Sequence, residues 1–545
     1  MKLVGFGNDL RHAFRSIHRH AIFSGITVVI LGLGLAAVVS LYSIFDALLL
    51  RSLPIPEPET LVRVVRMRPE MSPLVDFRYS VYLALQKAKS LNNVCAIYDW
   101  SDSYRDGEMP ERVRVEAISD SCFTLFRVDA QLGRIPFPDD EASLGTPPVV
   151  VSHVFWKRHY SLDHDVLNRK VLVHGHPFVV LGVFPEGFNG VTIDTSPDVW
   201  VPLSALTLLL SNENAAVKLD DLWYEIIARR KSGVDLAAAR DETYSLFRGA
   251  MERIIGQHPE ATRQISENEL GGKFELEPIG RGVSQLRSQV SSYVTFSLVG
   301  AGVLLIMVCT NVSALSAARW ISRESELAVR LALGSSVGQL CRLAVLEALF
   351  LVALGALAGF VFALGIIPLL LRMLPPVQLL DASVVPLSLD ARFDFRVFAF
   401  AFAVTCGVAV LVSLLPAVQA LRTDIHSPLR TARSSYAVKG DVILITSQIA
   451  FCTLLLVCAT LLTVTLRRLQ LTDPGFAQDH VLTFALDLET AGRVEAQRSL
   501  MGQRLLNEMK QLPGVRGVAF ASRPLMRGTG FRMTVAPTGE TTRPD

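Results

Sequence analysis

Residues 319–334, RWISRESELAVRLALG, stand between two long apolar stretches, and this pattern decides the fold. Residues 288–318 before them and residues 348–371 after them carry no charged side chain. Each apolar stretch is long enough to cross a hydrocarbon core of about 30 Å as a tilted helix. The sequence therefore predicts two membrane spans, at about 290–318 and 343–371, joined by a short charged connection.

The charged connection is itself predicted to be helical over residues 320–340. Leu327 and Leu331 fall on one side of such a helix, while Glu326 and Arg330 are four residues apart and can pair along a neighbouring flank. Gly334 ends the pattern. A short amphipathic helix held between two spans is a handle on which a protein outside the bilayer can push.

The composition agrees with a membrane protein. Half of the residues are hydrophobic and only 19% are charged, which is unusual for a soluble enzyme. The formal net charge of +2 argues against nucleic acid as a partner. The lipid bilayer is the first partner that the sequence implies.

Three further apolar stretches complete the membrane part. They cover residues 21–50, 397–421 and 442–466, so about five transmembrane helices are predicted. Residues 1–20 form an amphipathic pattern with arginines on one face, which resembles an interfacial helix. Asp46 stands at the outer end of the first span, where we expect it to reach water.

Basic residues predict the orientation of the chain. They gather in residues 1–20, in the connection between the second and third spans, and in residues 422–440. Short loops rich in lysine and arginine stay in the cytoplasm. The N-terminus is therefore predicted to be cytoplasmic, with residues 51–287 and 467–545 on the other side of the membrane.

Residues 51–287 are predicted to form a large α+β domain. A strand, a helix and a strand open the segment, and a matching set closes it, at 61–65, 77–89, 94–98, 222–229, 236–255 and 274–278. Short strands dominate the residues between these sets. The economical interpretation is one domain with a β-rich insertion at about 128–218.

The C-terminal residues repeat the opening of this domain. A predicted strand at 481–486, a helix at 493–511 and a strand at 518–520 follow a span, as the first set does. The chain therefore resembles one complete unit followed by the start of a second repeat, with a partial second outer domain at 467–545.

The sequence offers no catalytic or metal motif. We find no G-x-x-x-x-G-K-[ST], no H-E-x-x-H and no paired-cysteine metal motif, so no cofactor, no metal and no enzymatic activity are predicted. His174, Gly175 and His176 lie between two predicted strands, where a turn is the favoured interpretation over a metal site. Cys95 and Cys122 are both outside the membrane, where a disulfide is one alternative, although spacing alone does not set the geometry.

Three polar residues lie near the cytoplasmic end of the second span. Asn311, Ser313 and Ser316 could line a path or join helices, and helix packing is the favoured alternative. The spans contain no chain of buried ionisable residues, which argues against a proton relay.

The order of one span, a large outer domain and three more spans resembles that of the macrolide-exporter-type ABC permeases, with a MacB-like periplasmic core and an FtsX-like membrane domain. Four local matches carry the resemblance: residues 46–51 (DALLLR), 151–156 (VSHVFW), 197–203 (PDVWVPL) and 326–334 (ELAVRLALG). A second unit begins after residue 440, and this makes the chain similar to the duplicated orphan permeases of the acidobacterial type. This chain departs from them by ending within the second outer domain.

The resemblance implies a permease subunit in the cell (inner) membrane that has a separate cytoplasmic ABC ATPase as its partner. Motion driven by ATP would pass through the predicted helix at 320–340, the coupling helix, to the outer domains, for efflux, export or extraction of a substrate. The residues that the resemblance assigns to coupling are Arg323, Glu324, Glu326, Arg330 and Gly334.

The same resemblance leaves other partners and functions open. A second copy, a second permease half and a periplasmic protein are the further partners that it implies. The alternative functions are a non-transporting regulator of a cell-wall enzyme and an inactive truncated remnant.

Overall fold

The computed structural model divides the chain into two compact units. A membrane unit comprises residues 1–47, 290–373 and 391–482, and a sheet unit comprises residues 48–289, 374–390 and 483–545. The structure describes residues 21–67, 73–107, 109–136, 140, 145–210, 218–257, 271–322, 329, 337–373, 377–378, 384–385, 393–421, 435–472, 481–482 and 495–520. The predicted helix within residues 1–20 lies outside these ranges.

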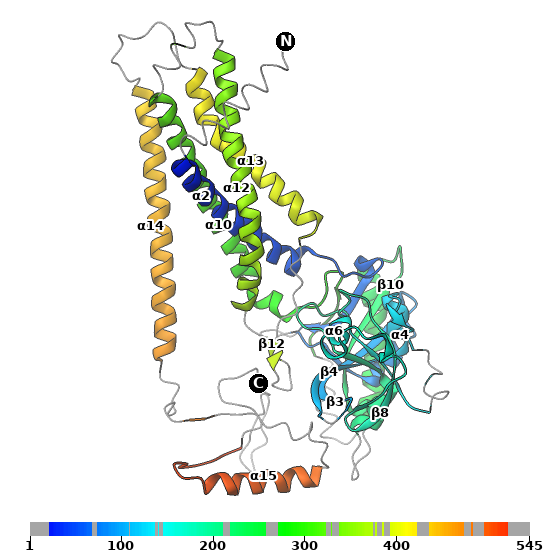
Figure 1. The fold of residues 1–545 in the computed structure, drawn as a ribbon. Coiled ribbons are helices and arrows are strands. Elements are labelled where there is room, and N and C mark those ends of the chain that lie inside the picture. Colours follow the sequence, from blue (N-terminus) through cyan, green and yellow to red (C-terminus); the bar gives the residue numbers. More distant parts are fainter. Residues whose placement is uncertain are drawn as a thin grey trace. The chain divides into compact units, whose positions relative to one another are not determined.

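Among the described residues, five long helices contain a stretch long and apolar enough to cross a membrane (Figure 1). They are α2 (Ala21–Phe45, continued by the π-helical turn Asp46–Leu50), α10 (Gln285–Ser322), α12 (Val337–Met373), α13 (Phe395–Leu421) and α14 (Ser435–Leu471). They form because uncharged apolar runs in lipid must satisfy their backbone groups within the segment. The predicted membrane-helical fold is confirmed.

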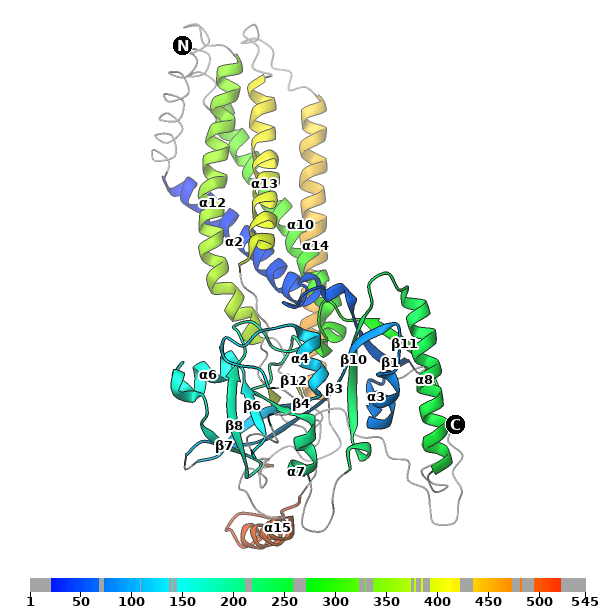
Figure 2. The ribbon, with the colours of Figure 1, turned by 90° about the vertical axis from the view of Figure 1, so that its right-hand side faces the viewer.

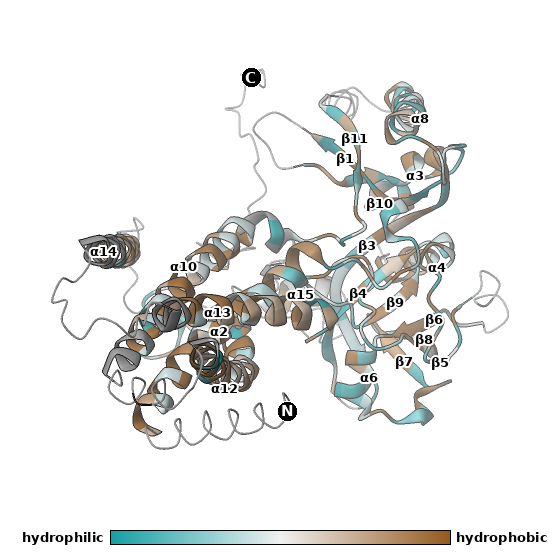
Figure 3. Ribbon diagram, turned by 90° about the horizontal axis from the view of Figure 1, so that it is seen from above, coloured by the Kyte–Doolittle hydropathy of each residue, from teal (hydrophilic) through white to brown (hydrophobic). Residues whose placement is uncertain are grey.

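Four of these helices share one apolar core. Leu31 and Leu35 of α2, Leu305 of α10, Val352 of α12 and Val412 of α13 are buried together. Helix α14 differs, because none of the apolar stretch within Gln448–Leu471 is buried against the other helices. Figure 3 shows α14 apart from the other four helices.

The sheet unit is built on one continuous mixed sheet. Its strand order is β11-β1-β10-β3-β4-β9-β6-β8-β5, with β2 paired to β10 and β7 paired to β3 and β8. The strands are β1 (Leu61–Met67), β2 (Asp76–Arg78), β3 (Leu91–Arg105), β4 (Glu111–Ile118), β5 (Leu132–Gly133), β6 (Pro148–Val151), β7 (Lys170–Val173), β8 (His176–Val183), β9 (Val199–Pro202), β10 (Trp223–Arg230) and β11 (Lys273–Pro278). Strands β5 to β9 lie within the predicted β-rich insertion, so the predicted α+β character is confirmed.

Two helices cover the first part of this sheet (Figure 2). They are α3 (Tyr79–Leu85) and α8 (Leu236–Gln257). Phe247 of α8 packs against Phe77 and Phe274, with ring centroids 5.9 and 5.1 Å away. Helix α3 is shorter than the predicted range 77–89, because Asp76–Arg78 pair with β10 as strand β2 before the helix begins.

Strand β3 is much longer than the predicted strand 94–98. Its first part pairs with β10, and its second part pairs with β4 and then with β7, so one strand runs from the first part of the sheet into the insertion. Ser101, Asp102 and Ser103 are residue types that favour turns, yet all three are buried in this strand. The tertiary environment overrides their local preference.

A short strand pair and one further helix lie in the C-terminal half of the described chain. Strands β12 (Val377–Gln378) and β13 (Val384–Val385) form a small antiparallel pair. Helix α15 (Glu495–Lys510) lies within the predicted helix 493–511. The predicted strand at 518–520 is wrong, because these residues are described without regular structure. The remaining predicted strand, 481–486, lies mostly outside the described residues, so the second repeat stays a prediction.

Candidate functional site

The five coupling residues lie outside the described part of the chain. Arg323, Glu324, Glu326, Arg330 and Gly334 fall between the end of α10 at Ser322 and the start of α12 at Val337. The coupling helix between these two membrane helices therefore stays a prediction.

Helices α2 and α12 approach each other closely through glycines. A Cβ atom added at Gly32 would lie 3.1 Å from the Ala358 Cβ and 3.3 Å from the Gly355 carbonyl oxygen. A Cβ added at Gly359 would lie 3.0 Å from the Gly32 carbonyl oxygen. Gly355 and Gly359 form a G-x-x-x-G pattern, which lets two membrane helices come into backbone contact. This pattern was present in the sequence and would have indicated the contact, but our sequence analysis missed it.

A polar contact joins α14 to α10. The Gln448 amide nitrogen donates to the Thr310 hydroxyl oxygen and to the Asn311 side-chain oxygen, each at 2.9 Å. Sequence analysis singled out Asn311 but missed Gln448 and Thr310. An amide in a predicted span was the available signal, because a polar side chain in lipid seeks a partner.

The other two polar residues of α10 differ in their contacts. The Ser313 hydroxyl donates to the Val412 carbonyl oxygen of α13 at 3.3 Å. The Ser316 hydroxyl oxygen is buried without a hydrogen-bond partner in the described structure. Asn311 and Ser313 thus contact neighbouring helices, which is the geometry that the packing interpretation requires.

Asp46 is buried, so the expectation that it reaches water is wrong. Its exposed fraction is 0%. Four residues earlier, the Tyr42 ring stacks on Phe400 of α13 with 3.6 Å between ring centroids. The end of α2 is therefore covered by protein, and sequence position alone did not show this.

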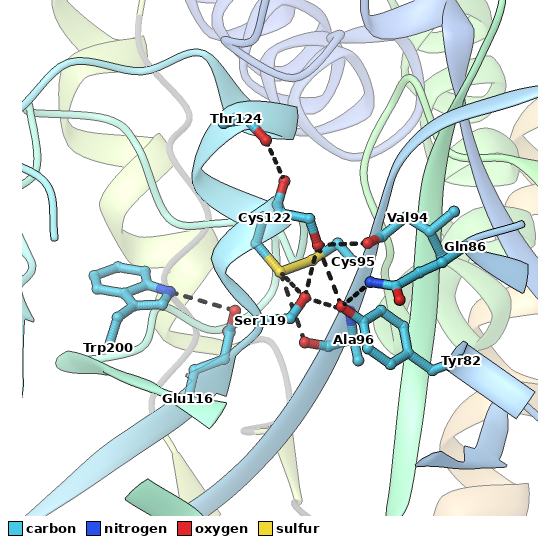
Figure 4. The surroundings of a disulfide bond; sticks show 11 residues. Tyr82, Gln86, Val94, Cys95, Ala96, Glu116, Ser119, Cys122, Thr124 and Trp200 are labelled. Carbon is cyan, nitrogen blue, oxygen red and sulfur yellow. Dashed lines mark hydrogen bonds between the residues drawn. A yellow bond between two sulfur atoms is a disulfide. The ribbon is translucent and has the colours of Figure 1, made fainter. Parts of the chain in front are cut away.

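Cys95 and Cys122 form a disulfide in the sheet unit (Figure 4). The bond joins β3 to α4 (Asp120–Phe126), and both cysteines are fully buried. The Ser119 hydroxyl oxygen accepts a hydrogen bond from the Ala96 backbone N–H at 3.1 Å and lies 3.4 Å from the Cys122 sulfur. The alternative that the sequence left open is thus decided by the approach of two cysteines that are 27 residues apart in the chain.

Glu116 is a buried carboxyl group in the same unit. It is 3% exposed and lies on β4, and its Oε1 accepts a hydrogen bond from the Trp200 indole N–H at 3.3 Å (Figure 4). Burial raises the pKa of Glu116 to about 8, against the opposing effect of the Arg114 charge. Glu116 is therefore mostly protonated at neutral pH.

His174 and Gly175 form the turn between β7 and β8, as predicted. Both have positive φ angles, 50° and 78°. The His174 Nδ1 lies 2.9 Å from Asp102 Oδ1, which holds the turn on strand β3. Among the residues that the structure describes, no group of three or more potential metal ligands comes together.

Two family models match the chain. A MacB-like periplasmic core domain matches residues 24–245, and an FtsX-like permease C-terminal domain matches residues 296–425. The two matches cover the first four membrane helices and most of the sheet unit.

Curated relatives carry names from the same family. The macrolide export ATP-binding/permease protein MacB of Hahella chejuensis (strain KCTC 2396) is 22% identical over 347 residues, which is 63% of this chain and 46% of that protein. The pyoverdine export ATP-binding/permease protein PvdT of Pseudomonas savastanoi pv. phaseolicola is 22% identical over 291 residues, 53% of this chain and 38% of that protein. The chain thus spans less than half the length of these relatives.

Solved structures of outer domains are also similar. The periplasmic region of MacB from Actinobacillus actinomycetemcomitans matches with 12% identity and a TM-score of 0.30, covering 43% of this chain and 92% of that one. The extracellular domain of the transporter YknZ from Gram-positive bacteria matches with 15% identity and a TM-score of 0.29, covering 40% of this chain and 98% of that one.

Proposed function

The chain belongs to the MacB/FtsX-like ABC permeases, and from this premise we propose that it is a permease subunit that transmits ATP-driven motion across the membrane. The observation that supports the proposal is the presence of both matched domains in one chain, in the order that places a large sheet domain between the first and second spans. Such an arrangement can do mechanical work on a substrate outside the bilayer.

The ATPase is proposed to be a separate cytoplasmic subunit. The relatives are named as ATP-binding/permease proteins, whereas these 545 residues contain no phosphate-cradling G-x-x-x-x-G-K-[ST] motif. The proposed contact with the ATPase is the coupling helix at 320–340, with Arg323, Glu324, Glu326, Arg330 and Gly334. The relatives' names mention export of macrolides and pyoverdine, and export of a substrate is the proposed outcome for this chain as well.

The proposed orientation places the sheet unit outside the cytoplasm. Basic residues of the short loops support it through the positive-inside rule. The buried Cys95–Cys122 disulfide supports it independently, because disulfides persist in oxidising compartments.

A binding experiment tests the proposal. The detergent-solubilised chain is immobilised and offered individually purified soluble ABC ATPases from its host, with and without Glu326→Lys. We expect one ATPase to bind the native chain and to be lost from the variant, because the reversed charge repels Arg330 and alters the docking face. The variant should still fold, since an exposed i, i+4 pair contributes only about 0.3–0.5 kcal/mol.

A matched charge reversal controls for nonspecific effects. Glu252→Lys changes an exposed residue of α8 in the sheet unit, where its side chain pairs with Arg248 at i, i+4. This variant should bind the ATPase like the native chain. If no ABC ATPase binds the folded native chain, the proposed function is wrong; if Glu326→Lys binds normally, the coupling residues are misassigned.

A further inference from the structure

The six residues between β11 and α10, together with the first three residues of α10, form a dense joint in the sheet unit. This joint, residues 279–287, leads from the last strand of the sheet to the start of the second membrane helix. Its first residue is already held, because the Ile279 backbone N–H donates to the Leu61 carbonyl oxygen of β1 at 3.0 Å. Two further sets of contacts hold the rest.

The first set ties the joint to the end of the first span. Arg287 Nε donates to the Leu48 carbonyl oxygen at 2.8 Å, and Arg281 Nη1 donates to the Leu49 carbonyl oxygen at 3.2 Å. The last carbonyls of a helix lack partners within the helix, and cationic donors suit them. The Leu53 backbone N–H also donates to the Gly280 carbonyl oxygen at 2.9 Å.

Arg287 also forms hydrogen bonds within the joint. Its Nη1 donates to the Gly282 carbonyl oxygen at 3.0 Å, and its Nη2 donates to the Arg281 carbonyl oxygen at 2.7 Å. The planar guanidinium has its donors in a fixed fork, so one side chain holds the carbonyl groups of Leu48, Arg281 and Gly282 in a single geometry. A lysine could not reproduce these three contacts.

The second set ties the joint to the β-rich insertion. The Ser284 hydroxyl donates to Asp194 Oδ1 at 2.6 Å, and its oxygen accepts from the Arg287 backbone N–H at 2.8 Å as the N-cap of α10. Asp194 is 1% exposed. Two backbone hydrogen bonds lie beside this contact: Val283 N–H to Val191 O at 2.8 Å and Ile193 N–H to Val283 O at 3.0 Å.

Packing leaves the joint little freedom to shift. Gly282 has a φ of 77°, a conformation that favours glycine, and a Cβ added there would lie 2.5 Å from Ile193 Cγ2. The chain therefore passes tightly against the insertion at this point.

We propose that residues 279–287 are a rigid joint that carries movement of the first two membrane helices into the β-rich insertion, with Arg287 and Asp194 as its positioning residues. The inference rests on the proposed function, which supplies the movement. A flexible linker without such hydrogen bonds would absorb a displacement of α10 through changes in its own backbone dihedral angles. Here the backbone N–H and carbonyl groups of Val283 are both hydrogen-bonded to the insertion, and Ser284 bonds to Asp194, so a displacement reaches the insertion.

Amide hydrogen exchange on the full chain in nanodiscs tests the joint without any ATPase. We expect slow exchange in peptides covering 279–287 and 189–196, and faster exchange in both after Arg287→Gln or Asp194→Ala. Asp194→Asn keeps an acceptor oxygen for Ser284 and should restore slow exchange. Fast exchange in the native chain, or no change in Arg287→Gln and Asp194→Ala, would overturn the rigid joint.

A distance measurement tests the transmission. Nitroxide labels are placed at Lys157 in the insertion and Arg253 on α8, both exposed, in a chain whose five free cysteines are replaced by alanine. In the presence of the ABC ATPase that binds the native chain, we expect the distance between the two labels to change between the ATP-trapped and ADP states. Arg287→Gln and Asp194→Ala should lose this change while ATPase binding and turnover persist, and Asp194→Asn should retain it.

The outcomes distinguish failure of the proposed function from failure of the proposed joint. Arg248→Gln, which alters an exposed arginine of α8, serves as the control and should behave like the native chain. A native chain that binds no ATPase contradicts the proposed function, whereas a native chain that binds the ATPase but shows no ATP-dependent distance change contradicts the joint. A native change that survives in both Arg287→Gln and Asp194→Ala contradicts the joint alone.

Discussion

The sheet unit and the membrane unit are stabilised by different contacts. In the sheet unit, buried side chains such as Tyr224 and Phe247 in one cluster and Trp200 in a second fill the core, and the hydrophobic effect drives their burial. In the membrane unit the surroundings are as apolar as the side chains, so burial alone does not select a partner. Close backbone approach and a few hydrogen bonds select it instead.

The contrast between α12 and α14 shows this rule within the membrane unit. Helix α12 carries Gly355 and Gly359 and lies in backbone contact with α2. Helix α14 is equally apolar but has no such contact in the described residues, and Gln448 supplies its side-chain hydrogen bonds to α10. A long apolar helix thus needs either small residues or polar ones to be held by its neighbours.

Removing the disulfide should have the largest effect, and only on the sheet unit. Cys95→Ala with Cys122→Ala removes a cross-link that closes a loop with a sequence separation of 27 residues. The chain-entropy model gives a loss of about 3.5 kcal/mol for a loop of this size. Thermal unfolding followed by tryptophan fluorescence measures it, since Trp100, Trp156, Trp200 and Trp223 all lie in this unit.

Cys406→Ala is the matched control, because Cys406 is a free and exposed cysteine of α13. It should leave the unfolding temperature unchanged. An unchanged unfolding temperature in the double variant as well would show that the core alone stabilises the sheet unit.

Filling the glycine contact should weaken the membrane unit next. Gly32→Leu forces a side chain into a space where Cβ alone meets α12 at 3.1 Å, and overpacking costs about 1–3 kcal/mol. Cys309 is buried in this unit, so its reaction with a thiol dye on heating reports unfolding of the helices. The other free cysteines are replaced by alanine for this measurement.

Gly25→Leu is the control on the same helix, since a Cβ at Gly25 meets nothing within 4 Å. It should leave the labelling temperature of Cys309 unchanged. Equal effects of Gly32→Leu and Gly25→Leu would show that the close contact does not hold α2 and α12 together.

Glu116 should make the stability of the sheet unit fall as pH rises. The pKa of Glu116 is about 8 in the folded chain and near its ordinary value of 4.5 when unfolded, so the folded state holds the proton more tightly between these values. The stabilisation is complete below about pH 4.5 and is lost as pH rises through 8, with a slope of at most about 1.4 kcal/mol per pH unit. Glu116→Gln should flatten the dependence measured by tryptophan fluorescence during unfolding.

Asp99, Arg114 and Glu225 also act on Glu116, so the control must leave them in place. Glu252→Gln changes an exposed carboxylate of α8 and should preserve the native pH dependence. A Glu116→Gln chain with the native slope would assign the dependence to other groups.

Gln448→Leu should lower stability the least of these variants. It should, however, loosen the position of α14 relative to α10. Interhelical hydrogen bonds in membranes contribute about 0.6–2 kcal/mol, and this variant loses two of them. Nitroxide labels at the exposed Leu454 of α14 and Leu304 of α10 should give a broader distance distribution.

Thr453→Ala tests whether the loss of any polar side chain on α14 broadens the distance distribution. The Thr453 hydroxyl donates only to Ile449 O of its own helix, at 2.8 Å. It should leave the distribution narrow. If Gln448→Leu also leaves it narrow, apolar contacts position α14 and the contrast with α12 disappears.

The sequence could predict the elements that a local pattern specifies. Five uncharged apolar runs gave the five spans, because a chain in lipid must satisfy its backbone groups within the segment. Short uninterrupted apolar runs indicated strands such as β6 and β9, and His174-Gly175 indicated the turn before β8. Strand β3 was predicted too short because its buried Ser101, Asp102 and Ser103 have local preferences for turns.

The sequence by itself thus determined the membrane class, the alternation of strands and helices, and the family, since all three rest on patterns that neighbouring residues form. The tertiary structure alone decided that Cys95 meets Cys122, that Asp46 is buried, and that Arg287 reaches Leu48. Each of these depends on residues far apart in the chain. Distance and direction between such residues are set by packing, which no local pattern records.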